Sequence, residues 1–148
     1  MKKLPNFTLS LIDGSVLKSS EITSKTILFF YPKAMTPGCT VEVNEFQSNL
    51  NKFQNLAFTI IGCSKDPIEN NIKFAEKYKL KYSLASDLTD VCEKLGIWIE
   101  KSMYGKKYFG IDRSTFMIDS KGKLFKQWNK VKVEDHVKEV LEIAKNCP

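Results

Sequence analysis

Two apolar runs mark buried strands in the first half of the chain. Residues 26–31 (TILFFY) and 57–63 (AFTIIGC) carry no charged side chain. Such runs are typical of strands covered on both faces, as in a parallel sheet. Residues 83–85 are a candidate for a short third strand. Each of the two runs is followed by a segment whose apolar residues are spaced as in a helix, so the pattern predicts alternating strands and helices.

Four helices are predicted from apolar residues three and four positions apart. The first follows residue 36, and the second follows Asp66-Pro67, where Glu69 completes a capping box. The third ends at Gly96, and the last spans Val133–Lys145. The inward-facing positions are, in chain order, Cys39, Val43, Phe46, Leu50 and Phe53; Ile68, Ile72 and Ala75; Leu88, Val91, Cys92 and Leu95; and Val133, Val137, Val140, Leu141 and Ala144.

Two hairpins complete the predicted fold. Residues 7–11 and 16–18 are strands joined by a turn at Asp13-Gly14. Near the C-terminus, residues 115–118 and 124–128 are strands joined by a turn at residues 120–122. Together with the alternating strands and helices, this favours an α/β sandwich with a mostly parallel centre and a hairpin on one side.

Length and hydropathy favour one soluble domain. The chain has 148 residues, 43% of them hydrophobic, and no internal repeat or linker divides residues 1–148. No stretch approaches the roughly 18 consecutive apolar residues of a membrane span, and residues 1–10 lack the apolar core of a signal peptide. We therefore expect a single cytoplasmic domain without a membrane partner.

The charge balance argues against a nucleic-acid partner and draws attention to one residue. The formal net charge is +6, and the 23 basic residues include one arginine, Arg113. The lysines are scattered among carboxylates, and the arginine forks that read base edges are missing. In a chain that otherwise uses lysine, a retained arginine indicates a position that needs a planar, two-pronged donor, although chance survival is the simpler alternative.

Histidine and cysteine usage excludes several kinds of site. His136 is the only histidine, so histidine-clustered metal sites are excluded and a Ser-His-Asp triad would depend on that one residue. The cysteines are Cys39, Cys63, Cys92 and Cys147, and none forms the C-x-x-C pair of a zinc knuckle or a thioredoxin-type dithiol. We expect Cys92 to pack in the core, Cys63 to end a buried strand, and Cys147 to be exposed and mobile.

The segment between the first strand and its helix carries the most specific chemistry. It reads YPKAMTPGC over residues 31–39. Thr36 is a good N-cap, Pro37 suits the first helical position, and Cys39 is then the third. Free backbone N–H groups and the helix dipole favour thiolate over thiol there, and a nearby arginine would add to the effect.

The string FYPKAMTPGCTVE closely resembles the active-site segment of the peroxiredoxins, specifically the Q subfamily, also called bacterioferritin comigratory proteins or thioredoxin-dependent peroxide reductases. The resemblance continues through DVCEKLGIW (90–98), KSMYGK (101–106) and RSTFMID (113–119), in the right order and spacing. It spans nearly the whole chain. It implies a thioredoxin-like α/β fold, with a central mixed sheet flanked by helices and an N-terminal β-hairpin.

The resemblance implies a role for each residue of the motif. Cys39 would be the peroxidatic thiolate, which attacks a peroxide oxygen and becomes a sulfenic acid. Thr36 would hydrogen-bond the peroxide or the thiolate, and Pro32 would shield the sulfur from water. Arg113 would hold thiolate and peroxide together and stabilise the charge on the leaving oxygen. Glu42 matches a family glutamate that orients its neighbours, and it is equally well explained as a first-turn acid that favours the helix dipole.

The residues that complete the catalytic cycle depart from the family pattern. Many Q-type members carry a resolving cysteine five residues after the peroxidatic one, and others carry it in the following helix. Here those positions are Asn44 and Ala75. Two hypotheses follow: an external thiol attacks the sulfenic acid in a one-cysteine cycle, which we favour, or Cys63, Cys92 or Cys147 forms an atypical disulfide.

These features predict a thiol peroxidase that reduces hydrogen peroxide and organic hydroperoxides in antioxidant defence without a metal, haem or flavin cofactor. The resemblance implies thioredoxin or glutathione/glutaredoxin as the reductant and favours a monomer. A thiol-disulfide oxidoreductase is the second enzymatic interpretation, and the missing C-x-x-C argues against it. A non-catalytic redox sensor or basic interaction module is the alternative from another class, and turnover with a thiol reductant would distinguish it from an enzyme.

Overall fold

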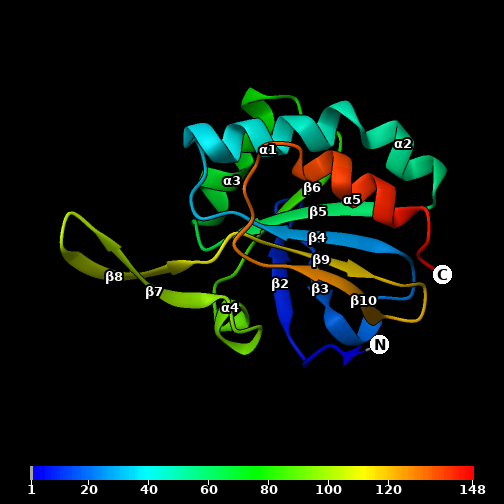
Figure 1. Ribbon diagram of the computed structural model, residues 1–148, viewed down its shortest axis with the longest axis horizontal. Helices are drawn as coiled ribbons and strands as arrows, with labels where there is room; N and C mark the ends of the chain where they lie inside the picture. The colour runs from blue at the N-terminus through cyan, green and yellow to red at the C-terminus, as the bar shows by residue number, and fades with distance from the viewer. Residues whose placement is uncertain (1) are drawn as a thin grey trace.

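The computed structural model describes residues 2–148 as one large sheet, a two-stranded ribbon and the helices that cover the sheet (Figure 1). Within these residues, no helix combines the length and the apolar character that crossing a membrane requires. In chain order the elements are β1 (Lys2–Lys3), β2 (Thr8–Leu11), β3 (Val16–Lys18), the short 3-10 helix η1 (Ser19–Glu21), β4 (Thr26–Phe30), α1 (Pro37–Ser48), α2 (Leu50–Asn55), β5 (Thr59–Ser64), α3 (Ile68–Lys77), β6 (Ser83–Ser86), α4 (Val91–Lys94), β7 (Trp98–Met103), β8 (Lys106–Ile111), β9 (Ser114–Ile118), β10 (Lys123–Trp128) and α5 (His136–Ala144).

The large sheet has its strands in the order β1-β10-β9-β4-β5-β6-β2-β3. β4, β5 and β6 are parallel neighbours at its centre, and the remaining pairings are antiparallel. The predicted parallel centre is confirmed. The predicted hairpins are also confirmed, as β2–β3 near the N-terminus and β9–β10 near the C-terminus.

The two faces of the sheet bury separate cores because successive residues of a strand point in opposite directions. Along β4, Ile27 and Phe29 lie in the core beneath α1, α2, α3 and α5, whereas Leu28 and Phe30 lie in the core on the opposite face. The N-terminal segment and α4 close that second core. Figure 1 shows α1, α2 and α5 above the sheet and α4 below it. Side chains that belong to different cores are therefore separated by the sheet.

The first predicted helix is divided in two. Its predicted inward residues, from Cys39 to Phe53, are all buried, but α1 ends at Ser48 and α2 begins two residues later. At the break, the side chain of Asn49 donates a hydrogen bond to the Glu45 carbonyl (2.9 Å). Asparagine favours helix ends because its side chain competes with the backbone for such partners.

The predicted capping box at α3 is wrong. Pro67 occupies the cap position without a side-chain cap, because the Asp66 carboxylate is engaged elsewhere, by the Ala34 N–H (2.8 Å) and the Ser64 hydroxyl (2.6 Å). The predicted inward face is also shifted. The buried residues of α3 are Asn71, Phe74 and Ala75.

Two further helix boundaries differ from the prediction. Leu88 precedes α4 and is 57% exposed, because the carboxylate of Asp87 binds the backbone N–H groups of Thr89 and Val91 and starts the helix later. α5 begins at His136 instead of Val133, because Asp135 has a left-handed backbone (φ 59°) that does not continue a right-handed helix.

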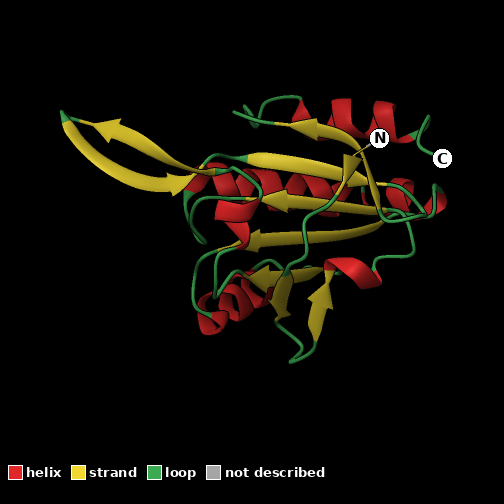
Figure 2. Cartoon of the chain, turned by 90° about the horizontal axis from the view of Figure 1, so that it is seen from below, coloured by secondary structure: helices red, strands yellow, loops and turns green. Residues whose placement is uncertain are grey.

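The hairpin formed by β7 and β8 was not predicted. It projects away from the rest of the molecule (Figures 1 and 2), and its exposed side chains include Met103, Tyr104, Tyr108 and Phe109. Because neither face of its outer part is buried, its sequence lacks the alternation of apolar and polar residues on which strand prediction depends. Tyr104 and Gly105 form its tip, both with positive φ (51° and 78°), as a two-residue hairpin turn requires.

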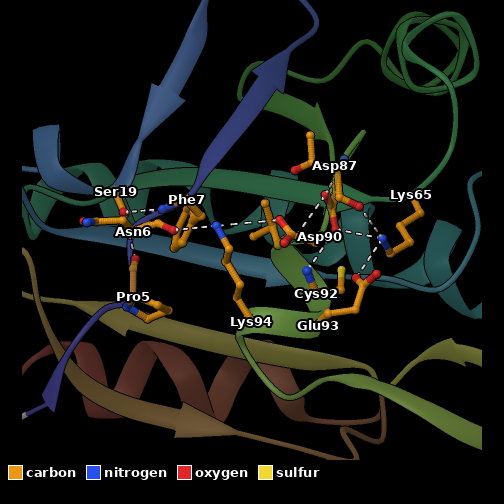
Figure 3. A network of polar contacts seen from close by, with 12 residues as sticks. Pro5, Asn6, Phe7, Ser19, Lys65, Asp87, Asp90, Cys92, Glu93 and Lys94 are labelled. Atoms are coloured by element: carbon orange, nitrogen blue, oxygen red, sulfur yellow. Dashed lines mark hydrogen bonds and ion pairs between the residues drawn. The ribbon is translucent and has the colours of Figure 1, made fainter.

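Polar contacts attach α4 to the body (Figure 3). Asp87 accepts hydrogen bonds from the Cys92 N–H (2.9 Å) and pairs with the ammonium of Lys65 (3.2 Å). Lys65 also pairs with Glu93 (2.9 Å) and lies 5.0 Å from the centre of the Trp98 ring, at the start of β7. The hairpin therefore starts beside the lysine that pairs with α4.

Candidate active site

Cys39 lies in the first turn of α1. Because α1 begins at Pro37, Cys39 is the third helical residue, as predicted, and the first turn contains no acidic side chain. The cysteine is 1% exposed and lies in the core beneath the helices. The N–H groups of a first turn have no helical acceptors and the helix dipole is positive there, so both make this position suited to an anion.

Arg113 approaches the sulfur of Cys39 from a neighbouring strand. Its Nη2 donates to Cys39 Sγ at 3.3 Å. β9 is antiparallel to β4, with Ser114 opposite Phe30, so the residue that precedes β9 lies beside the loop that follows β4. Gly38 provides the space for this approach, since a Cβ there would lie 3.3 Å from Arg113 Nη2.

Glu42 lies one helical turn after Cys39 and holds the other arm of the guanidinium. Its Oε1 accepts a hydrogen bond from Arg113 Nη1 at 2.6 Å, whereas Oε2 has no partner among the described residues. The side chain is fully buried. Burial raises the pKa of Glu42 to about 7, against the opposing effect of Arg113. Of the two explanations for Glu42, orienting Arg113 therefore fits the geometry.

Thr36 occupies the cap position of α1 but does not cap it. Its backbone is extended (φ −78°, ψ 154°), and its hydroxyl makes no bond to the helix, donating instead to the Lys33 carbonyl at 2.7 Å. The predicted side-chain cap is therefore wrong. Since the O–H is engaged, the Thr36 oxygen keeps its lone pairs for a donor such as a peroxide O–H. Pro32 is half-buried in the same loop.

A buried polar network holds this loop, residues 31–36, against the sheet. The Ala34 N–H donates to Asp66 (2.8 Å), and the Tyr31 hydroxyl donates to Asn71 Oδ1 (2.6 Å). Asn71 in turn donates to the Ala85 carbonyl (3.1 Å). Neither Asp66 nor Asn71 was predicted to matter for the site. A polar residue between the apolar positions of a helix was the available signal for Asn71.

Cys63 and Cys92 lie on the opposite face of the sheet from Cys39. Both belong to the core closed by α4, whereas Cys39 belongs to the core beneath the helices. Cys63 in β5 pairs with Phe30 in the neighbouring strand β4, so both side chains point into the core closed by α4. Burial raises the pKa of both thiols. The expected core position of Cys92 is confirmed, and Cys63 lies near the end of a buried strand, as expected, and packs in the same core.

Cys147 is buried (6% exposed) and not exposed as predicted. Its backbone N–H bonds to the Ala144 carbonyl (3.2 Å), which continues the turn of α5 into the core. Lys25 and Asp119 are the charged groups that act on its pKa, which burial raises. Both residues flank the Thr26–Ile118 pair, which lies at the end of β4 away from Arg113. Cys147 is therefore near one end of β4, and Cys39 follows its other end. The length of the strand, roughly 13 Å at 3.3 Å per residue, separates them.

The two positions at which the family resemblance implies a resolving cysteine hold residues without redox chemistry. Asn44 donates to the Thr40 carbonyl within α1 (2.9 Å), and Ala75 packs in the core beneath the helices. Within residues 2–148, no cluster of histidine, cysteine, aspartate and glutamate has the arrangement of a metal site.

Comparison with known proteins gives this fold and site a class. The model of the AhpC/TSA family matches residues 1–127. Peroxiredoxin Bcp of Bacillus subtilis is 44% identical over 147 residues, 98% of this chain and 94% of that protein. Peroxiredoxin Bcp of Escherichia coli K12 is 38% identical, over 95% of this chain and 92% of that protein.

Solved structures agree. Peroxiredoxin Q of Xanthomonas campestris superposes with a TM-score of 0.88 at 34% identity, over 95% of this chain and 90% of that one. The same score is found for the bacterioferritin comigratory protein of that organism, whose alkyl peroxide reduction was studied in trapped intermediate and ligand complexes.

The fold is therefore the thioredoxin fold of the peroxiredoxins, and Cys39 lies at the start of a helix in it. The chain belongs to the AhpC/TSA family, and its relatives within that family are the peroxiredoxins of the Q/Bcp group.

Proposed function

We propose that this chain is a thiol-dependent peroxidase that reduces hydrogen peroxide and organic hydroperoxides at Cys39. The observation that carries the proposal is the guanidinium of Arg113, 3.3 Å from a sulfur at the N-terminus of a helix. The alkyl peroxide reduction described for the Xanthomonas campestris protein supports organic hydroperoxides as substrates.

The reaction is a two-electron oxidation of sulfur. The Cys39 thiolate attacks one peroxide oxygen, so an S–O bond forms while the O–O bond breaks. Cysteine becomes a sulfenic acid, and the leaving oxygen takes up a proton to give an alcohol, or water from hydrogen peroxide. Arg113 lies where charge develops and stabilises it with a fixed donor. The Thr36 oxygen accepts the peroxide O–H, and Pro32 limits the access of water.

An external thiol completes the cycle in our proposal. A disulfide needs Cα atoms roughly 4.4–6.8 Å apart. Cys63 and Cys92 are on the far face of the sheet and Cys147 is at its far end, so a bond from any of them to Cys39 would require local unfolding. The external thiol attacks the sulfenic sulfur, releases water and forms a mixed disulfide with Cys39. A second thiol of the reductant then attacks this disulfide, so that Cys39 becomes a free thiol again and the reductant leaves as a disulfide. Thioredoxin and glutathione with glutaredoxin are the proposed reductants.

Trapping the oxidised cysteine tests the proposal. The reduced protein receives one equivalent of hydrogen peroxide in the presence of a sulfenic-acid trap, and peptides are analysed by mass spectrometry. We expect an adduct on Cys39 alone, and no peroxide consumption by Cys39→Ser. Cys92→Ser is the matched control, because it replaces another buried thiol outside the site, and it should retain turnover with a thiol reductant.

The outcomes separate the alternatives. A disulfide between Cys39 and another cysteine would overturn the one-cysteine cycle while leaving the peroxidase intact. One oxidation per molecule without turnover, with each reductant, would identify a sensor. Because a one-cysteine enzyme has no fast internal resolution, excess peroxide should carry Cys39 to sulfinic acid when reductant is withheld.

The same proposal includes a single-domain monomer that acts in the cytoplasm without a nucleic-acid or membrane partner. The four cysteines are free thiols in the structure, which fits a reducing compartment. Analytical ultracentrifugation of the reduced and oxidised forms tests the oligomeric state, and a mass of 17.0 kDa is expected for both.

A further inference from the structure

The β7–β8 hairpin begins and ends beside the active site. β8 leads through Asp112 directly to Arg113. The hairpin carries three lysines and one acidic residue, Glu100. Lys106 and Lys107 are exposed near the tip, where Tyr104 is 98% exposed, far out on the projecting ribbon of Figures 1 and 2. The third lysine, Lys101, behaves differently.

The side chain of Lys101 runs back along the ribbon toward the body. Lys101 is paired with Tyr108 across the hairpin, but its ammonium donates to the carbonyl of Ile111, three residues nearer to the body. Its stem crosses Gly110, where a Cβ would lie 3.4 Å from Lys101 Cδ. The ammonium is therefore held at the base of the hairpin, two residues before Arg113.

The charge of Lys101 is not neutralised by an ion pair. Among the described residues no carboxylate lies within 4.0 Å of it. Burial lowers the pKa of Lys101, and Arg113 adds to this, while Asp112 and Cys39 favour the charged form. The carbonyl that holds this ammonium belongs to Ile111, two residues along the chain from Arg113, whose Nη2 lies 3.3 Å from Cys39 Sγ.

Arg113 divides its guanidinium between two acidic partners. Its Nη1 donates a hydrogen bond to Glu42 (2.6 Å), and its Nη2 donates one to Cys39 Sγ (3.3 Å). Above a pH of about 7, where Glu42 is ionised, Glu42, Arg113 and a Cys39 thiolate carry a net charge of −1. At any pH, attack on a peroxide develops further negative charge on the leaving oxygen.

We propose that Lys101 is a positioning residue of the peroxidase site: its ammonium, fixed on the Ile111 carbonyl, supplies the second positive charge that stabilises the Cys39 thiolate and the leaving oxygen through space. The inference rests on the proposed function for its catalytic part. The hairpin then has a role in the site, because it brings this charge to the site from outside the sheet.

Two lysine variants of the same hairpin make the test. Lys101→Met removes the charge at the base and keeps an unbranched stem, while Lys106→Met makes the same change at the exposed tip. Rapid-mixing measurements give the second-order rate constant for hydrogen peroxide between pH 4.5 and 8.5. In parallel, mass spectrometry follows alkylation of Cys39 by iodoacetamide, a neutral reagent, over the same pH range.

We expect Lys101→Met to lower the peroxide rate constant three- to tenfold at pH 7, which is about 0.7–1.4 kcal/mol. The pH midpoint of both reactions should rise by about half a unit, because thiolate formation loses a stabilising charge. Lys106→Met should stay within twofold of the wild type with an unchanged midpoint, and Lys101→Arg should keep the wild-type midpoint.

Equal behaviour of Lys101→Met and Lys106→Met would overturn the inference. A lower rate without a shift of midpoint would also overturn it, since the hairpin would then only support the fold. If the wild type failed to react with peroxide, the proposed function would fall, and the alkylation midpoints would still decide whether Lys101 acts on Cys39.

Discussion

Replacing Glu42 by glutamine should change how stability depends on pH. Burial raises the pKa of Glu42 from 4.5 to about 7, so the folded chain keeps a proton there that the unfolded chain releases above pH 4.5. Stability from this group is complete below pH 4.5 and is lost as the pH rises through about 7. At 1.4 kcal/mol per pKa unit the loss is roughly 3 kcal/mol, with an error of about one unit in the shift.

Glutamine has the shape of the protonated acid and keeps an oxygen for Arg113 Nη1. Glu42→Gln should therefore avoid the loss. The difference in unfolding free energy, variant minus wild type, should increase by roughly 3 kcal/mol between pH 4.5 and pH 8. Urea unfolding at half-unit steps of pH, followed by tryptophan fluorescence, measures it. Taking the difference removes the contributions of the groups that both proteins share.

Glu45→Gln is the matched control because it makes the same change of charge one turn further along α1, away from Arg113. Its difference from the wild type should vary little over the same range. A flat difference for Glu42→Gln would refute the reasoning, since it would mean that Glu42 is ionised at no cost inside the folded protein. A difference that falls with rising pH would mean that the attraction of Arg113 outweighs burial.

Three further predictions follow from named contacts. Arg113→Lys should lower the peroxide kcat/KM about 100-fold, because one ammonium cannot serve both Glu42 and Cys39; near-normal kcat/KM would contradict the role of the fork. Gly62→Ala should destabilise the fold by about 1–3 kcal/mol in urea unfolding, because its Cβ would meet the Phe29 ring at 2.6 Å, and an unchanged midpoint would show that the ring can move. Burial lowers the pKa of His136 from 6.5 to about 4, so the wild type should lose at most roughly 3 kcal/mol of stability between pH 6.5 and pH 4. His136→Gln should remove that loss. If the stability of the variant and of the wild type declined in parallel as the pH falls, His136 would be excluded as its cause.

Local sequence determined most of the elements and the position of Cys39 at the start of a helix. Unbroken apolar runs predicted β4 and β5, and the order Thr36, Pro37, Gly38, Cys39 predicted the helix start, since these preferences act within one turn. The resemblance to the Q-type peroxiredoxins added the family, and the comparisons confirm it. The β7–β8 hairpin was missed because its strands have no buried face to impose a pattern.

The tertiary structure decided which side chains meet. Arg113 lies 74 residues from Cys39 in sequence, and only the pairing of β9 with β4 brings them together. The same sheet separates Cys63 and Cys92 from Cys39, and no spacing along the chain reveals on which face a cysteine lies. The burial of Glu42, which raises its pKa, likewise depends on α1 packing against the sheet. Patterns within a few residues follow from backbone geometry, which is local, whereas contacts, burial and charge at the site depend on how distant segments pack.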